Sequence, residues 1–395
     1  MSWIKVPKIE LQNRKDQMAL LSKNIEDFND RELHWLFQIE VSKKIPVLYK
    51  KKLLSKYSIT NKLNDRYLIF THRPSGFMSQ DRVLRLAILL GKYLDRTVVL
   101  NSMILSGYHN RLFSSEPVVS NLKHFYDMKK MNSYHKVLNT LDLSLDKIVE
   151  MICSDSKHYY EIGDTFDFLK NIDAKYICCR ANVLDIPRSI CDEDKFRKEI
   201  DCGGKSIVVS KDIMQKSKKI INSLGEYYSI HVRRGDILHE DSKVILHKLL
   251  DAKEVEYYTN LIDHIDQLKK WIPLGSKIYI ATDEEDLTMF DGLKKYYDIY
   301  FWKDFNIELS PEENNSYYVL SVEELVMINA YRFISTVSSV IPVYVDYRRN
   351  FLENIDSKIY SLSFEIYLDF IKKQHKMFPS TLLPSLKSLE ERLIS

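Results

Sequence analysis

Length, composition and charge narrow the class of protein before any motif is considered. The chain has 395 residues, too many for one ordinary hydrophobic core, and a hydrophobic fraction of 45% excludes a disordered protein. Its 58 basic and 55 acidic residues leave a formal net charge of +3, which argues against a general nucleic-acid binder.

The first half of the sequence begins with charged helical patterns and continues into an α/β unit. Residues 1–62 have apolar positions at helical spacing among lysine runs, which predicts an N-terminal helical extension. Residues 66–71 predict a buried strand, and a turn at 73–80, a helical pattern and a second strand at 96–100 follow. This order is typical of a parallel sheet.

The second half alternates more clearly, although the stretch from about 105 to 215 gives no clear pattern. Strands are predicted at 228–232, 277–283 and 333–336, and helices at 217–224, 255–272, 286–297 and 323–331. This alternation favours a doubly wound parallel sheet, in which ligands bind beyond the carboxyl ends of the strands.

The five cysteines and the apolar segments indicate whether the protein holds a metal and where in the cell it is found. No CxxC pair and no cysteine–histidine cluster with zinc spacing is present, so the sequence predicts no metal site. The first residues lack the apolar core of a signal peptide, and no run of about eighteen apolar residues predicts a membrane span. We therefore expect a soluble protein of the reducing cytoplasm.

Polar clusters occupy three of the predicted strand ends: residues 231–236 (HVRRGD), 283–284 (DE) and 338–339 (SS). Two guanidinium groups and a histidine at the end of a buried strand are costly without an anionic partner, and the fork of arginine matches phosphate oxygens. An ion pair between Arg233 and Asp236 that merely closes the loop is the alternative. The convergence of three clusters favours a diphosphate site.

These segments resemble the motifs of the fucosyltransferase superfamily that uses GDP-fucose. Residues 231–236 resemble the first motif, HxRRxD, and residues 279–284 (YIATDE) resemble the second. Residues 323–339 resemble the third, an acidic helical segment followed by a strand and two serines. Residues 73–80 (RPSGFMSQ) resemble a degraded GxGNQ turn. The order and spacing match the α1,6- and protein O-fucosyl branches.

The resemblance implies an α/β fold of GT-B type, with two Rossmann-like domains facing a cleft and added N-terminal helices. It implies a helical extension over 1–62, an acceptor-side domain over 63–215, a GDP-fucose-binding domain over 216–350 and C-terminal helices over 351–395. The missing secretory signal, membrane anchor and disulfide set fit a bacterial or viral enzyme of the cytosol.

The implied reaction is the inverting transfer of fucose from GDP-fucose to a hydroxyl of a glycan or protein, without a metal or other cofactor. Arg233 would bind the β-phosphate and stabilise the leaving group. Glu240 or Asp241 would be the base, unless this loop is merely a solvated acidic one. Further substrate contacts would come from His231, Arg234, Asp236, Asp283, Glu284, Ser338, Ser339, Gly76, Phe77, Ser79 and Gln80.

Two of these roles are more specific. His231 and Asp283 would contact the nucleoside, with Asp283 accepting from guanine N–H groups, while Arg234 and Asp236 would shape the loop. Two alternatives stay open: a GT-B transferase of another nucleotide sugar, and a non-catalytic sugar-nucleotide-binding protein. The carboxylate of Asp283 favours guanine, and the presence of both arginines favours catalysis.

Overall fold

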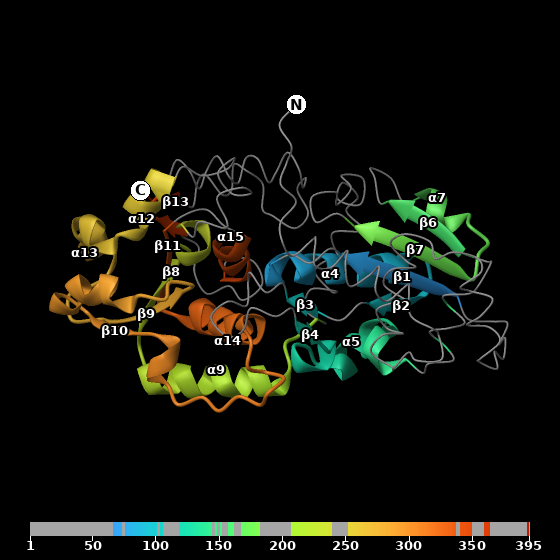
Figure 1. Cartoon of the computed structure of the whole chain (residues 1–395), viewed down its shortest axis with the longest axis horizontal. Helices are drawn as coiled ribbons and strands as arrows, with labels where there is room; N and C mark the ends of the chain where they lie inside the picture. The colour runs from blue at the N-terminus through green and yellow to red at the C-terminus, as the bar shows by residue number, and fades with distance from the viewer. Residues whose placement is uncertain are drawn as a thin grey trace, which may run out of the picture. The chain divides into compact units, whose positions relative to one another are not determined.

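The chain divides into two compact units, Met1–Gly107 with Glu116–Val208 and Tyr108–Ser115 with Val209–Ser395. Each unit contains a parallel sheet (Figure 1). The computed structural model describes residues 66–72, 76–100, 103–105, 118–143, 147, 151, 157–161, 167–181, 207–238, 252–336, 340–349, 359–363 and 393–394.

The first unit has, within its described residues, a five-stranded parallel sheet of order β5-β2-β1-β7-β6 and a small antiparallel pair, β3 with β4. Its elements are β1 (Tyr67–His72), α4 (Phe77–Tyr93), β2 (Thr97–Leu100), β3 (Met103–Leu105), β4 (Val118–Ser120), η2 (Leu122–His124), α5 (Met128–Tyr134), β5 (Val137–Asn139), η3 (Thr140–Asp142), β6 (Lys157–Glu161), α7 (Asp167–Lys170) and β7 (Tyr176–Ala181).

The predicted strand–helix–strand unit is confirmed as β1, α4 and β2, and the two strands pair directly in parallel. A close approach fixes how α4 lies on β2, because a Cβ atom added to Gly91 would overlap Cγ2 of Val98. At the start of β2, the buried guanidinium of Arg96 donates to the carbonyls of Ala174 at 2.7 Å and Ile172 at 2.8 Å. Arg96 thereby joins β2 to the loop before β7.

The second unit has, in the part that the structure describes, a six-stranded sheet of order β10-β9-β8-β11-β12-β13, and every pairing is parallel. Its elements are α9 (Lys211–Leu224), β8 (Tyr228–Val232), α10 (Gly235–Leu238), α12 (Ala252–Thr259), η6 (Leu261–His264), α13 (Ile265–Trp271), β9 (Lys277–Thr282), η7 (Leu287–Lys295), β10 (Asp298–Tyr300), η8 (Trp302–Asp304), α14 (Ser316–Asn329), β11 (Arg332–Ser335), α15 (Val340–Tyr347), β12 (Ile359–Ser361) and β13 (Leu393–Ile394).

The doubly wound pattern predicted for this half is confirmed, because helices cover both faces of the sheet. On one face, apolar strand residues such as Ile230 and Ile280 pack against Leu268 and Phe290 from α13 and η7. On the other face, Tyr227 just before β8 donates to the carbonyl of Val326 in α14 at 2.6 Å. The sheet therefore lies between two layers of helices (Figure 1).

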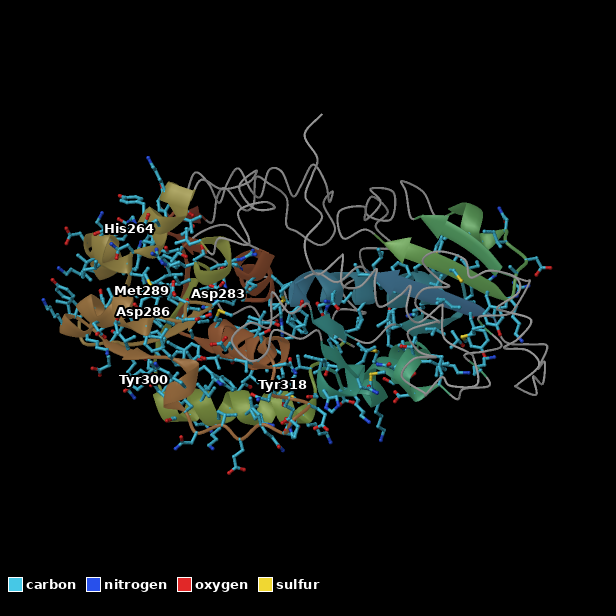
Figure 2. All side chains as sticks on the ribbon, in the orientation of Figure 1. His264, Asp283, Asp286, Met289, Tyr300 and Tyr318 are labelled. Atoms are coloured by element: carbon cyan, nitrogen blue, oxygen red, sulfur yellow. The ribbon has the colours of Figure 1, made fainter. Side chains whose placement is uncertain are left out.

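A second layer packs outside α14. The hydroxyl of Tyr318 in α14 and the ammonium of Lys216 in α9 both donate to the same oxygen of Asp212. Lys216 also reaches Glu313 at 3.2 Å. Figure 2 labels Tyr318 on α14 next to α9. This polar cluster joins α9 to α14, which in turn packs against the sheet.

Two predicted helices differ from the structure. Residues 255–272 were predicted as one helix but form α12, η6 and α13, because Asn260 leaves helical geometry at φ −80° and ψ 83° and its side chain donates to Asp263 at 2.7 Å. The helix predicted over 286–297 is a 3₁₀ helix, η7, whose start is capped by Asp286. In the described part of the chain, no helix is long and apolar enough to cross a membrane.

Candidate active site

The carboxyl ends of three neighbouring strands bring the predicted polar residues to one edge of the second sheet. β8 lies between β9 and β11, with Val232 in register with Thr282 and His231 in register with Ser335. Arg233, the residue after β8, therefore lies between the ends of β9 and β11. The prediction that these strand ends lie side by side is confirmed.

The turn after β8 is fixed by Asp283, the first residue after β9 (Figure 2). Its Oδ1 atom accepts from the backbone N–H groups of Arg234 at 2.8 Å and of Gly235 at 3.0 Å. A carboxylate that accepts two backbone donors holds a turn firmly, because such charge-assisted bonds are stronger than neutral ones. Asp283 thus sets the path of the chain directly after Arg233.

The side chain of Arg234 is held by protein groups on two sides. Its Nε lies 3.2 Å from Oε2 of Glu284, and both side chains are only 18% exposed. Its Nη1 donates to Thr259 at the end of α12 at 3.0 Å, and its Nη2 lies 4.0 Å from Glu256. These contacts tie the loop after β8 to α12 and to the residue after Asp283, and the role implied for Arg234 stays a prediction.

Glu284 uses its carboxylate within the protein as well. While Oε2 faces Arg234, Oε1 accepts from the N–H groups of Glu285 at 2.9 Å and Asp286 at 3.2 Å. The substrate contact implied for Glu284 stays a prediction.

Arg233 and His231 flank this fixed turn on the strand side. His231 is 4% exposed, whereas Arg233 is half-buried at the point where the strand ends. Thr336, at the end of β11, donates to the carbonyl of His231 through its hydroxyl at 3.0 Å and its N–H at 3.3 Å. The backbone under Arg233 is therefore held from β9 on one side and from β11 on the other.

Several predicted residues are not placed. Glu240, Asp241, Ser338 and Ser339 lie outside the described residues, and for Asp236 and Ser79 the structure describes the backbone alone. The choice of base, the serine contacts and the alternative ion pair between Arg233 and Asp236 stay predictions.

In the first unit, the predicted turn is the beginning of α4. Gly76 precedes the helix, and its carbonyl accepts the N–H of buried Gln80 at 3.2 Å. Phe77 is 3% exposed, and its ring centroid lies 5.5 Å from that of Phe125. Phe77 therefore packs in the core of its unit, and substrate contacts by this turn stay predictions.

The two glutamates of the third segment face inward from α14. The hydroxyl of Tyr279 in β9 donates to Oε1 of Glu323 at 2.7 Å, and Arg348 pairs with Glu324 at 2.8 Å. Burial raises the pKa of Glu323 to about 7, against a smaller lowering by the Tyr279 hydrogen bond. Glu323 is thus a titratable group beneath the strands that carry the candidate site.

The sequence comparison identifies the family. Residues 67–352 match the model of the GDP-fucose protein O-fucosyltransferase family. The chain belongs to this family. It is a GDP-fucose-dependent fucosyltransferase whose units each contain a parallel sheet, and the family and enzyme class predicted from the motifs are confirmed.

Solved structures of fucosyltransferases are similar to the chain at low identity. POFUT1 in complex with GDP is 14% identical, with a TM-score of 0.48 over 76% of this chain and 98% of that chain. A mutant of Arabidopsis thaliana FUT1 with GDP is 10% identical, with a TM-score of 0.45 over 84% and 77%. NodZ α1,6-fucosyltransferase soaked with GDP-fucose is 14% identical, with a TM-score of 0.39 over 72% and 92%. Comparison with curated protein sequences found no match.

In this fucosyltransferase, no group of three or more histidine, cysteine, aspartate or glutamate side chains among the described residues could hold a metal ion. The backbone next to Arg233 is held in place by Asp283 and Thr336. Sequence reasoning missed Thr259 and Thr336 as supports of this edge. Neither threonine carries a local signal, because their roles arise from contacts between distant segments.

Proposed function

We propose that the enzyme transfers fucose from GDP-fucose to a hydroxyl group of a protein or glycan with inversion and without a metal, and that Arg233 carries the catalytic electrostatics. The supporting observation is the fixed turn after β8. Asp283 and the Arg234–Glu284 pair hold the residues directly after Arg233, so its guanidinium starts from a preorganised backbone.

The proposed step has simple electron and proton flow. The bond between C1 of fucose and the β-phosphate oxygen breaks, and its electron pair stays on the diphosphate. The acceptor oxygen forms the new bond on the opposite face of C1 and loses its proton to a base, for which Glu240 and Asp241 are the candidates. Arg233 donates to the β-phosphate, where negative charge grows.

Arginine suits this task better than a flexible cation would. Its planar fork of donors can hold two phosphate oxygens at once and stays charged throughout the reaction. A preorganised donor of this kind contributes about 100- to 1,000-fold in rate, because it needs no rearrangement as the charge develops. Neutralisation of the diphosphate by arginine is the reason why we propose a metal-independent reaction.

Nucleotide specificity is the sharpest test of the proposed donor. Calorimetry of the full chain with GDP, GDP-fucose and UDP should give binding of both guanosine ligands and at least tenfold weaker binding of UDP. Turnover should survive EDTA. Absence of GDP binding would overturn the proposal, and loss of activity in EDTA that added Mg²⁺ or Mn²⁺ restores would overturn its metal-independent part.

We also propose a cytosolic location, as expected for a bacterial or viral enzyme. Cys179 in β7 is a buried free thiol, which supports a reducing compartment. Fractionation of producing cells should recover the activity with the cytosol, and recovery from a secreted fraction would contradict this location.

A further inference from the structure

Two serines at the end of β12 have buried hydroxyl groups without a hydrogen-bond partner among the described residues. Ser361 is 2% exposed and Ser363 is 0% exposed. Within the described part of the chain, neither Oγ atom has a hydrogen-bond partner. Buried hydroxyl groups in proteins are nearly always paired, because an unpaired one carries a penalty in free energy. Two such groups two residues apart suit a ligand that brings its own oxygen atoms.

The strand register places these serines at the edge that carries the candidate site. Ser335 of β11 is in register with His231 of β8 on one side and with Ser361 of β12 on the other. Residues in register on parallel strands point to the same face of a sheet, so His231, Ser335 and Ser361 form one row. Neighbouring strands are about 4.8 Å apart, which puts Ser361 about 10 Å from His231.

Ser363 lies in the turn that directly follows β12. The N–H of Leu362 donates to the carbonyl of Ser335 at 3.0 Å, and this hydrogen bond belongs to the pairing of Ser361 with Ser335. Both serines therefore lie at the carboxyl end of β12, at the same edge of the sheet as the proposed catalytic arginine.

The order of residues along the edge indicates which part of the donor these hydroxyls meet. Asp283 follows β9, Arg233 follows β8, and the serines end β12, two strands beyond Arg233. The resemblance implies that guanine lies at Asp283, after β9, and the β-phosphate is proposed at Arg233, after β8. The GDP-fucose molecule then continues toward β11 and β12. The diphosphate and the fucose of the donor would therefore lie near β11 and β12. Both carry many oxygen atoms that can pair with hydroxyl groups.

We propose that Ser361 and Ser363 are donor-binding residues that hydrogen-bond the diphosphate–sugar end of GDP-fucose. This inference rests on the proposed function, because it uses the placement of the β-phosphate at Arg233. The serines complete a site whose other groups come from β8, β9 and β11. They contribute neutral hydrogen bonds, which select oxygen positions without adding charge.

The test compares two ligands on the full chain. In calorimetry, the double variant S361A/S363A should bind GDP-fucose about tenfold more weakly than the wild type, because two neutral hydrogen bonds are lost. It should bind GMP within twofold of the wild type, because GMP lacks the β-phosphate and the sugar. The matched control is Ser321→Ala, which removes a buried hydroxyl that donates to Tyr317 in α14 at 2.7 Å, and it should leave the ratio of the two affinities unchanged.

Thermal unfolding without ligand shows whether the double variant loses donor contacts or loses stability. The double variant should melt at the same temperature as the wild type or higher, because alanine removes hydroxyls that have no partner within the described ranges. Unchanged affinity for GDP-fucose, with or without a lower melting temperature, would overturn the inference, and so would an equal loss for GMP. A wild-type protein that binds no GDP-fucose would instead overturn the proposed function itself.

Discussion

The buried carboxyl group of Glu323 makes the stability of the second unit depend on pH. Glu323 accepts a hydrogen bond from Tyr279 at 2.7 Å in a site where burial raises its pKa from 4.5 to about 7. The change Glu323→Gln keeps the shape and an oxygen that accepts this hydrogen bond, but it removes the titration.

Whether stability rises or falls with pH depends on which state, folded or unfolded, loses the proton of Glu323 first. As pH rises, the unfolded chain ionises first, near 4.5, while the folded state holds its proton until about 7. Stability is therefore lost across that window and then stays constant. One pH unit corresponds to about 1.4 kcal/mol, so the full penalty above pH 7 is about 3 kcal/mol. Between pH 5 and pH 8 the expected loss from this group is about 2 to 3 kcal/mol.

Urea unfolding at several pH values measures this loss. The free energy of unfolding of Glu323→Gln minus that of the wild type should increase by about 2 to 3 kcal/mol from pH 5 to pH 8. As a control, Tyr279→Phe keeps the carboxyl and removes the hydrogen bond that lowers its pKa, so the window should extend to higher pH. A difference between Glu323→Gln and wild type that does not change with pH would refute the reasoning.

Three further predictions follow from single contacts. Gly91→Ala should lower the free energy of unfolding by about 1 to 3 kcal/mol in urea, because the new Cβ overlaps Val98; an unchanged value would contradict the close approach of α4 to β2. Arg234→Met and Glu284→Gln should show a coupling energy of about 1 kcal/mol in a double-mutant cycle of stability, and additive effects would mean that the pair does not hold the turn. Arg349→Met should destabilise the protein by about 3 kcal/mol, since the buried guanidinium donates to carbonyls at the end of α14, including that of Ala330 at 2.7 Å; an unchanged urea midpoint would contradict this role.

The core of the second sheet could be predicted because its strands have a strong local signal. The strands β8, β9 and β11 are short, largely buried segments with apolar residues, and a parallel sheet must bring their carboxyl ends to one edge. The order of the strands therefore predicted that β8, β9 and β11 end at one edge of the sheet.

Other parts of the fold have no such signal. Residues 105–215 gave no clear pattern, and the reason lies in strands such as β5, which has only three residues, and β6, which reads KHYYE and forms one end of the five-stranded sheet. Strands that short, or that polar, show no alternation that a sequence pattern could reveal. The break at Asn260 depends on one side-chain contact inside an otherwise helical pattern.

The supports of the site also depend on tertiary contacts. Thr259 meets Arg234 across 25 residues of sequence, and Thr336 meets His231 across 105. Ser361 joins the row of His231 only through the order of the strands, since nothing in its local sequence resembles a motif. Residues that carry charge were therefore predictable, and the neutral residues around them required the fold.

The central claim is that Arg233 stabilises the departing diphosphate, and turnover of GDP-fucose by Arg233→Ala tests it most directly. Hydrolysis of GDP-fucose by the purified full chain should fall at least about 100-fold, the cost of losing one preorganised donor, while thermal unfolding stays that of the wild type. Hydrolysis within tenfold of the wild type, in a variant that is folded and binds GDP, would contradict the account.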